Sequence, residues 1–339
     1  MESQVSEERL KLEQHLAKAC DKNGSREEAR KCITNRLNQI CSHFLPHFVR
    51  ADTLAQKYQG IYTLSSKLIY LLAAVMVTAV SAGAIFKVQE TAITLFEIAA
   101  IAFILYLIYY GNRIGWRKRW QDNRLLAERL RHAVFLAMAD QPACSDAPRN
   151  TFYCKPNSDD AANRAFAEIW EDWIRQPRQG VYSDDQLPVI RDFLLTAWIE
   201  DQRNWHQSKT KMHKRNHEKL SLAGEMLFFT TLIAAVLHLV FHTFHVGGEF
   251  LAGCLTFLAI ACPSFGGAFS AMRNHFEHNK LSRRSEQMAR LLTGIMGRLM
   301  EVADMNSVRS IAEEAEKLMM SEAVDWHALI GFNSLQKPA

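Results

Sequence analysis

Four runs of apolar residues dominate the sequence, in two pairs with a short polar connector inside each pair. The first pair covers residues 68–86 and 91–110, and the second covers residues 223–244 and 250–272. Each run is about the length that a helix needs to cross roughly 30 Å of hydrocarbon. The pattern predicts an all-α integral membrane helical bundle, with four transmembrane helices as two hairpins and long cytoplasmic helical extensions.

The alternative is a large soluble bundle that buries these helices. Helices of that kind normally keep a polar stripe every three or four residues. The first and fourth runs contain no Asp, Glu, Lys, Arg or His, and this favours the membrane.

Basic residues crowd the ends of the four runs that lie away from the connectors. By the positive-inside rule, both termini and the long middle segment face the cytoplasm. No signal peptide is visible in residues 1–52, so the first span is expected to act as its own insertion signal. The net charge of +4 then reflects the orientation of the chain in the membrane and not nucleic-acid binding. The basic groups are Lys57 and Lys67; Arg113, Arg117, Lys118 and Arg119; Lys209, Lys211, Lys214, Arg215 and Lys219; and Arg273, Lys280, Arg283 and Arg284.

The order of segments repeats weakly, since each half has a helix, a hairpin and a helix that leaves the membrane. Ser25 and Glu28 form a capping-box pattern for one helix, which Pro46 is expected to end. A helix from Trp116 is expected to run straight out of the second span. The predicted regions are N-terminal cytoplasmic helices over 1–50, a first hairpin unit over 51–140, a loop and helix over 141–182, a second hairpin unit over 183–303, and a C-terminal helix and tail over 304–339.

Apolar positions after the fourth run recur at helical spacing, for example Met288, Leu292, Ile295 and Leu299. One helix cannot bury such a stripe alone. Either the helical extensions pack together beneath the membrane or the chain oligomerises, and the sequence does not choose.

Ionisable residues inside the spans are the first candidates for function, because each costs a few kcal/mol in lipid. They are Glu97, Glu225, His238 and His242. They line a water-filled path, or Glu225 and His242 lie at the interface and Glu97 makes an interhelical hydrogen bond. Near the middle of the fourth run, Pro263, Gly266 and Gly267 form either a gate hinge or a site of close packing.

Metal and enzyme chemistry find little support in the sequence. Histidines cluster beside the membrane, and Cys41 is near two more, but no acidic or cysteine ligand completes a familiar zinc pattern. Phosphate-loop, dinucleotide, zincin and nucleophile-elbow motifs do not occur. Seven cysteines without a C-x-x-C pair are expected to be reduced thiols. We predict no enzyme activity, cofactor or metal. The histidines concerned are His206, His213, His217, His275 and His278, with His43 and His47 near Cys41.

Three short motifs around the hairpins resemble those of the SLATT group, whose name records two-span effectors associated with nucleotide-signalling and nucleotide-sensing domains. The run NRLLAERLRHAVFLAMA is similar to the segment after a SLATT hairpin, WIEDQRNWHQSK to the segment before the second hairpin, and SEAVDW to a pattern near the C-terminus. The positions concerned are Arg124, Glu128 and Arg131; Asp201, Gln202 and Trp205; and Glu322 and Trp326.

The resemblance implies a membrane effector of a bacterial antiviral or conflict system, located in the bacterial inner (cytoplasmic) membrane. Such an effector forms or opens a pore when a separately encoded nucleotide-sensing protein or a nucleotide signal activates it. Because a pore needs more than one four-helix unit or a loosened bundle, we expect a homo-oligomer. The alternative is a membrane anchor or scaffold that assembles a soluble cytoplasmic partner through its amphipathic helices. An enzyme of lipid chemistry is the third reading.

Overall fold

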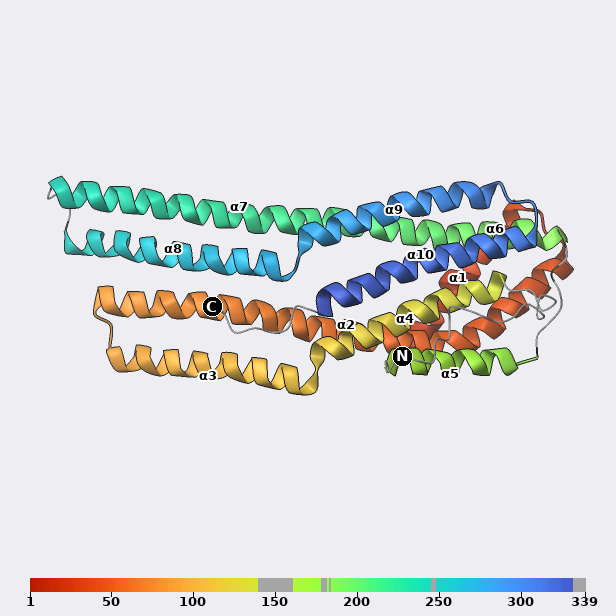
Figure 1. The fold of residues 1–339 in the computed structure, drawn as a ribbon, viewed down its shortest axis with the longest axis horizontal. Coiled ribbons are helices and arrows are strands. Elements are labelled where there is room, and N and C mark those ends of the chain that lie inside the picture. The colour runs from red at the N-terminus through yellow and green to blue at the C-terminus, as the bar shows by residue number, and fades with distance from the viewer. Residues whose placement is uncertain (140–160, 178–181, 183, 245–247, 332–339) are drawn as a thin grey trace. The chain divides into compact units, whose positions relative to one another are not determined.

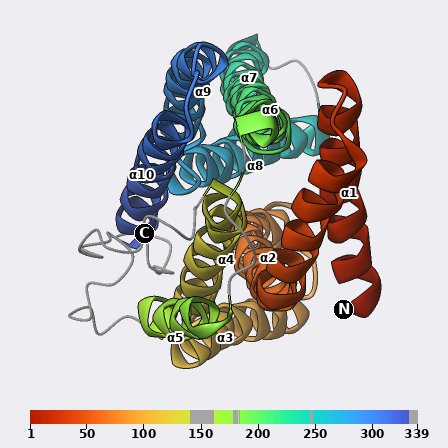
Figure 2. The ribbon, with the colours of Figure 1, turned by 90° about the vertical axis from the view of Figure 1, so that its right-hand side faces the viewer.

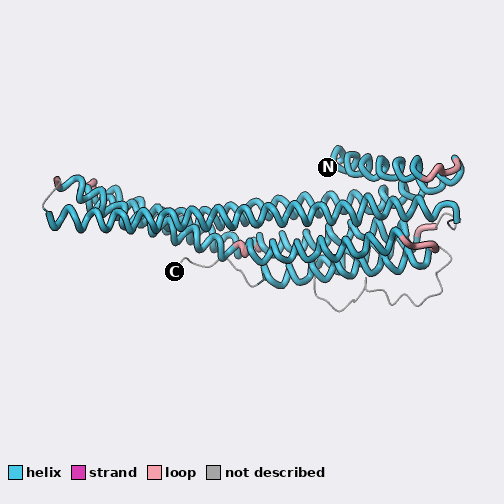
Figure 3. Tube along the Cα trace, turned by 90° about the horizontal axis from the view of Figure 1, so that it is seen from above, coloured by secondary structure: helices cyan, strands magenta, loops and turns pink. Residues whose placement is uncertain are grey.

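The computed structural model describes residues 1–139, 161–177, 182, 184–244 and 248–331, and the side chains as far as residue 322. Within these ranges the chain is helical and contains no strand, as Figure 3 shows by colour. This confirms the predicted all-α fold. The elements are α1 (Glu2–Lys22), α2 (Glu27–Phe86), α3 (Glu90–Ile114), α4 (Trp116–Ala139), α5 (Ala161–Arg175), the 3-10 turn Asp184–Gln186, α6 (Leu187–Leu194), the π-helical segment Leu195–Glu200, α7 (Asp201–Phe244), α8 (Glu249–His275), α9 (His278–Met300) and α10 (Met305–Gly331).

The chain divides into two compact units. We call the first the extramembrane unit; it comprises Met1–Tyr58, Lys118–Ser208 and Ser285–Phe332. The second, the hairpin unit, has Gln59–Arg117 and Lys209–Arg284 as its described parts. Long helices that start in one unit end in the other, since α2 and α7 each contribute residues to both.

The hairpin unit contains the four apolar runs. Four helices are long and apolar enough to cross a membrane, namely Glu27–Phe86, Glu90–Ile114, Leu187–Phe244 and Glu249–Met300. In Figure 1, α3 lies beside the second half of α2, and α8 lies beside α7. Only Lys87 to Gln89 separate α2 from α3. The protein is therefore a membrane protein by the length and composition of these helices.

Each hairpin ends in a sharp change of direction where the chain leaves it. Gly115 ends α3 with φ of 71°, a left-handed conformation that glycine adopts without a steric penalty. The prediction that one helix runs straight out of the second span was therefore wrong, because Gly115 separates α3 from α4. In the second hairpin the corresponding break, between α8 and α9, places Glu277 at φ of 45°.

Pro46 does not end a helix, contrary to the prediction from sequence. It lies inside α2, which continues without interruption to Phe86. Proline removes one backbone hydrogen bond within a helix. Here the neighbouring side chains of Phe44, Leu45 and Phe48 are buried, so tertiary packing holds the helix together across the proline.

The main hydrophobic core belongs to the extramembrane unit. Its most deeply buried members include Leu37 and Phe44 of α2, Leu130 of α4 and Phe193 of α6. The apolar stripe of α9 packs into the same core through Met288, Leu292, Ile295 and Leu299. Figures 1 and 2 show α9 and α10 side by side, and an ion pair of 2.6 Å joins Arg298 to Glu314. The chain therefore buries this stripe by itself.

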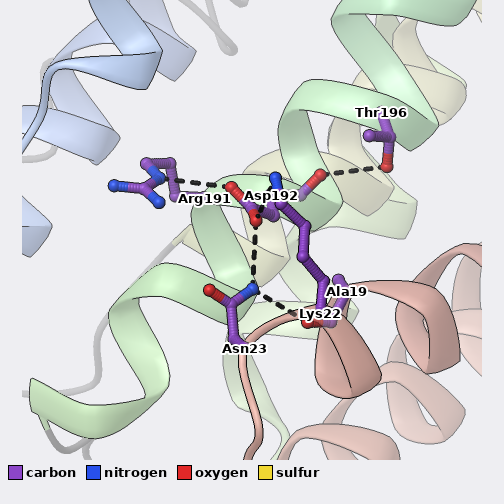
Figure 4. A network of polar contacts seen from close by, with 6 residues as sticks. All are labelled: Ala19, Lys22, Asn23, Arg191, Asp192 and Thr196. Carbon is purple, nitrogen blue, oxygen red and sulfur yellow. Dashed lines mark hydrogen bonds and ion pairs between the residues drawn. The ribbon is translucent and has the colours of Figure 1, made fainter.

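A buried carboxylate attaches α1 to α6 (Figure 4). Asp192 is 3% exposed, and its Oδ2 atom lies 2.9 Å from Lys22 Nζ. Asn23 donates a 3.0 Å hydrogen bond to the same oxygen and a 2.8 Å bond to the carbonyl of Ala19, at the end of α1. Burial alone would raise the pKa of Asp192, but these hydrogen bonds outweigh it and lower the pKa. The carboxylate is therefore ionised and fixes the end of α1.

Candidate functional site

Glu97 lies on the inward face of its span. The buried residues of α3 are Ala100, Ile104, Leu107, Ile108 and Gly111, spaced as one helical stripe. Glu97 continues this stripe by one turn and is half-buried. Among the described residues its carboxylate has no hydrogen bond or ion pair, so the predicted interhelical hydrogen bond is not seen there. Glu97 therefore faces the other helices of the hairpin unit and not the lipid.

Of the three candidates on α7, His238 is half-buried, whereas Glu225 and His242 are exposed. His242 lies one turn beyond His238, with the two ring centres 6.4 Å apart. Ala234 is the most buried residue of that span, and His238 lies one turn further along the same face, half-buried. The Nδ1 atom of His238 is buried and has no hydrogen-bond partner among the described residues. The structure thus separates Glu97 and His238 from Glu225 and His242.

A hydrogen-bond chain accounts for Glu225. Ser221 Oγ donates to Glu225 Oε1 at 3.0 Å, and Arg273 donates to Ser221 Oγ at 3.1 Å. Arg273 belongs to the last turn of α8, so Glu225 lies beside the basic end of the second hairpin. This position matches the interfacial alternative, in which the charge costs little.

Two neighbouring glycines of α8 differ in their surroundings, because Gly266 packs closely against α7 and Gly267 has open space beside it. A Cβ atom on Gly266 would lie 3.2 Å from the ring of Phe228 on α7, whereas one on Gly267 would meet nothing within 4 Å. Pro263 is inside α8, which continues on both sides of it. The geometry gives Gly266 a packing role between α7 and α8.

Motif residues from both halves of the chain meet in the extramembrane unit. Glu128 of α4 forms ion pairs with Arg124 and with Arg131, the latter at 2.9 Å. Arg124 also lies 3.8 Å from Asp52 of α2, and its guanidinium group is 5.6 Å from the ring centre of Trp205 on α7. We call Asp52, Arg124, Glu128, Arg131 and Trp205 the charged cluster. It connects α2, α4 and α7.

The carboxylate of Glu128 is the buried and ionised centre of the charged cluster. Burial alone would raise the pKa of Glu128, but Arg124 and Arg131 lower it to about 2. Burial lowers the pKa of His132 to about 4 and that of His206 to about 4. At neutral pH Glu128 is therefore a carboxylate and both imidazoles are neutral. A carboxylate held so firmly ionised is a poor general base, so the cluster is suited to holding helices together and not to proton transfer.

Sequence reasoning identified only part of this cluster. Arg124, Glu128, Arg131 and Trp205 were expected from the motifs, whereas Asp52 was missed. Two residues near the cluster, His132 and Trp198, were missed as well; their ring centres lie 5.8 Å apart. Trp198 is 1% exposed, and its ring stacks on Phe135 at 5.2 Å. His132 directly follows Arg131, and Trp198 opens the WIEDQRNWHQSK run, so the motifs themselves pointed to both residues.

The other motif residues lie at different places. Gln202 is buried, Asp201 is exposed, and Glu322 is half-buried on α10. Trp326 lies in α10, but its side chain is outside the described residues.

The histidines form hydrogen bonds and not a recognisable metal centre. No group of three or more His, Cys, Asp or Glu residues able to hold a metal ion occurs in the part of the chain that the structure describes. His213 Nδ1 lies 3.0 Å from His278 Nδ1. His43 uses Nε2 with the carbonyl of Ile169 and Nδ1 with Gln176, each at 2.9 Å. Burial raises the pKa of the Cys41 thiol to about 12, which makes it a poor metal ligand.

Comparison with known proteins gave one match. Residues 195–326 match the family model SLATT_1, described as SMODS and SLOG-associating 2TM effector domain 1. No curated protein and no solved structure matches the chain. The matched residues include α7, α8, α9 and the π-helical segment, but not Arg124, Glu128 or Arg131, whose resemblance to the family stays a prediction. Residues 195–326 of the chain are therefore similar to a SLATT domain.

Proposed function

We propose that this protein is a membrane effector of a bacterial antiviral or conflict system that forms or opens a pore in the inner membrane. It is closed in the resting cell. A separately encoded sensor or a nucleotide signal acts on its cytoplasmic helices and opens it. The support from comparison is the SLATT match, since the family description names a two-span effector domain.

The observation that carries the proposal is the position of Glu97 and His238. An ionisable side chain inside a span costs up to about 3 kcal/mol on insertion scales, and such residues usually face a bundle interior or a water-filled cavity. Glu97 and His238 occupy the inward stripes of their helices. A path for ions through the hairpin unit, or between several copies of it, provides water for both side chains.

The exposed surface of the spans agrees with a lipid environment. In the apolar stretch of the third span, on α7, 6% of the residues are buried, against 22% in each of the other three spans. Large apolar side chains cover it, including Phe228, Phe229, Leu232 and Leu239. Lipid covers such a surface, and so do neighbouring copies in the homo-oligomer that we propose.

The anchor or scaffold is less well supported. It needs an amphipathic face that a soluble partner covers. The amphipathic stripe on α9 that the sequence showed packs into the core of the extramembrane unit instead. That unit remains the proposed receiver of the activating signal, because α2 and α7 each run from it into a candidate span.

Membrane potential in living bacteria tests the proposal. The chain is expressed with and without its genomic neighbours, and a voltage-sensitive dye is followed during induction and phage challenge. Depolarisation before loss of viability is the expected result. An unchanged potential in all conditions, with insertion verified by fractionation, would contradict the pore and favour the anchor.

A further inference from the structure

The junction between α8 and α9 differs from its counterpart in the first hairpin. There Gly115 adopts the left-handed conformation, whereas here Glu277 does so, at φ of 45°. A residue with a side chain pays roughly 1 kcal/mol or more for this conformation. Surrounding contacts must therefore hold the junction, and we call residues 275–278 the α8–α9 joint.

A histidine pair holds the joint. His278 is the first residue of α9, and its Nδ1 atom lies 3.0 Å from Nδ1 of His213 on α7. Two nitrogens at this distance share one hydrogen, so one ring donates and the other accepts. When both rings are protonated, each nitrogen carries a hydrogen and the bond cannot exist. The contact therefore depends on the protonation of the pair.

Other polar and charged groups of α2, α7 and α8 lie near the histidine pair. Lys209 of α7 acts on His213, and His217 of α7 and Lys67 of α2 act on His278; all of these disfavour a positive ring. On α8, His275 Nε2 lies 3.2 Å from the hydroxyl of Tyr62 on α2. Glu277 is paired with Lys280 at 2.8 Å, so no acidic group in this set is directed at the pair.

A second contact joins the same two helices without any titratable group. Ser282 Oγ donates to the carbonyl of Thr210 at 3.2 Å, and Thr210 Oγ1 donates to the carbonyl of Ser282 at 3.5 Å. This contact lies one turn from the histidine pair along both helices. It provides an internal reference, because protonation does not act on it directly.

We propose that the α8–α9 joint is proton-sensitive, and that protonation of the His213–His278 pair separates the first turn of α9 from α7. The neutral pair closes the joint, and the doubly charged pair opens it. For a pore that is opened through its cytoplasmic helices, acidification then becomes a second control on α8. This extension rests on the proposed function, whereas the joint itself does not.

The sign and the range of the effect follow from linkage. Burial is the main cause that lowers the pKa of His213, to about 4, and it also lowers the pKa of His278. A histidine whose pKa is lowered in the closed state stabilises that state above its ordinary value of about 6.5. This stability is lost as the pH falls from 6.5 toward 4. The open population increases up to tenfold per pH unit for each histidine.

Hydrogen exchange of the full-length protein in lipid nanodiscs tests the proposal. The protection of the amides of residues 276–281, corrected for the intrinsic effect of pH on exchange, is measured between pH 8 and pH 5. The double variant His213→Asn with His278→Asn keeps a neutral hydrogen bond and cannot titrate. The double variant His213→Lys with His278→Lys places two fixed charges at the pair. His15→Asn and His15→Lys on α1 are the matched controls.

In the wild type we expect protection at the joint to fall more than tenfold between pH 8 and pH 5. The double Asn variant should stay protected throughout, and the double Lys variant should be unprotected already at pH 8. Amides of α3 report whether each variant is folded. The same pH dependence in the double Asn variant, or full protection in the double Lys variant, would overturn the proposal.

Ion flux through the same nanodisc-purified protein, reconstituted in vesicles, separates the two proposals. Loss of protection with flux that increases on acidification supports both the joint and its control of the pore. Loss of protection on acidification without ion flux at any pH would still support the proton-sensitive joint, but it would contradict the control of a pore by acid.

Discussion

Two carboxylates, one in each unit, lie in opposite environments. Glu128 in the extramembrane unit is buried between Arg124 and Arg131. Glu97 in the hairpin unit is half-buried on a membrane-spanning helix, with no ion pair among the described residues. Paired burial makes Glu128 a structural residue, since removing one partner leaves the other charges stranded. The lack of a partner makes Glu97 expensive in a closed bundle, and we connect this cost with function.

The largest expected effect is on the paired side of this comparison. Glu128→Gln removes the buried carboxylate whose pKa Arg124 and Arg131 lower to about 2, which costs on the order of 3 kcal/mol of stability. Thermal unfolding in detergent measures this loss. Glu286→Gln is the control, because Glu286 pairs with Arg290 at an exposed surface and such pairs are worth about 0–1 kcal/mol. If the two variants unfold alike, the charged cluster does not hold the unit together.

The pH dependence of the extramembrane unit sharpens the same contrast. Burial lowers the pKa of His132 to about 4, so the folded state favours the neutral ring. Stability is complete above pH 6.5 and declines as the pH falls toward 4, by on the order of 3 kcal/mol. His132→Gln should flatten this decline in a series of melting curves. His15→Gln should not, and a decline unchanged in His132→Gln would assign it to other groups.

The carboxylate of Asp192 is an intermediate case, because it is buried but its partner Lys22 is solvent-exposed. Asp192→Asn keeps an acceptor for Asn23 and loses the charge, so we expect a loss of about 1–2 kcal/mol. The effect should be local, with faster exchange of the amides of α1 and easier proteolysis between α1 and α2. Asp21→Asn, at an exposed ion pair with Arg30, is the control. Equal protection of α1 in both variants would remove Asp192 from this role.

The smallest effect concerns the packing between α7 and α8 in the hairpin unit. Alanine is a better helix former than glycine by about 1 kcal/mol. Gly267→Ala should gain this helix stability in full, because a Cβ atom there meets nothing within 4 Å. Gly266→Ala must also displace the ring of Phe228, which cancels part or all of the gain. A lower melting temperature for Gly266→Ala than for Gly267→Ala is expected, and the reverse order would contradict the packing role.

The membrane spans could be predicted from sequence because they depend on local composition alone. Runs of about 20 apolar residues have few other stable environments, and the structure places helices at all four. Helix ends were harder. At Pro46 tertiary packing overrode the local signal, and at Gly115 the change of direction came from one residue whose conformational freedom no periodicity reveals.

The candidate sites were predictable only as lists of residues. Motifs indicated Arg124, Glu128 and Trp205, but their meeting with Asp52 depends on how α2 packs against α4. Helical spacing could have separated Glu225 from His238 once the buried stripe of α7 was known, but it places His238 and His242 on one face, and only the structure shows that His242 is exposed. The His213–His278 bond links positions 65 residues apart, and nothing local in the sequence indicates it.

The measurement that tests the central claim most directly is a comparison of the inward and outward polar residues in the depolarisation assay. Glu97→Gln and His238→Asn change the two inward, half-buried candidates. Glu225→Gln and His242→Asn are matched changes at the two exposed candidates, which serve as the outward variants. At equal membrane levels, the account predicts that the inward variants change the rate or ion selectivity of depolarisation, whereas the outward variants behave like the wild type. Identical depolarisation by all four variants and the wild type would contradict it.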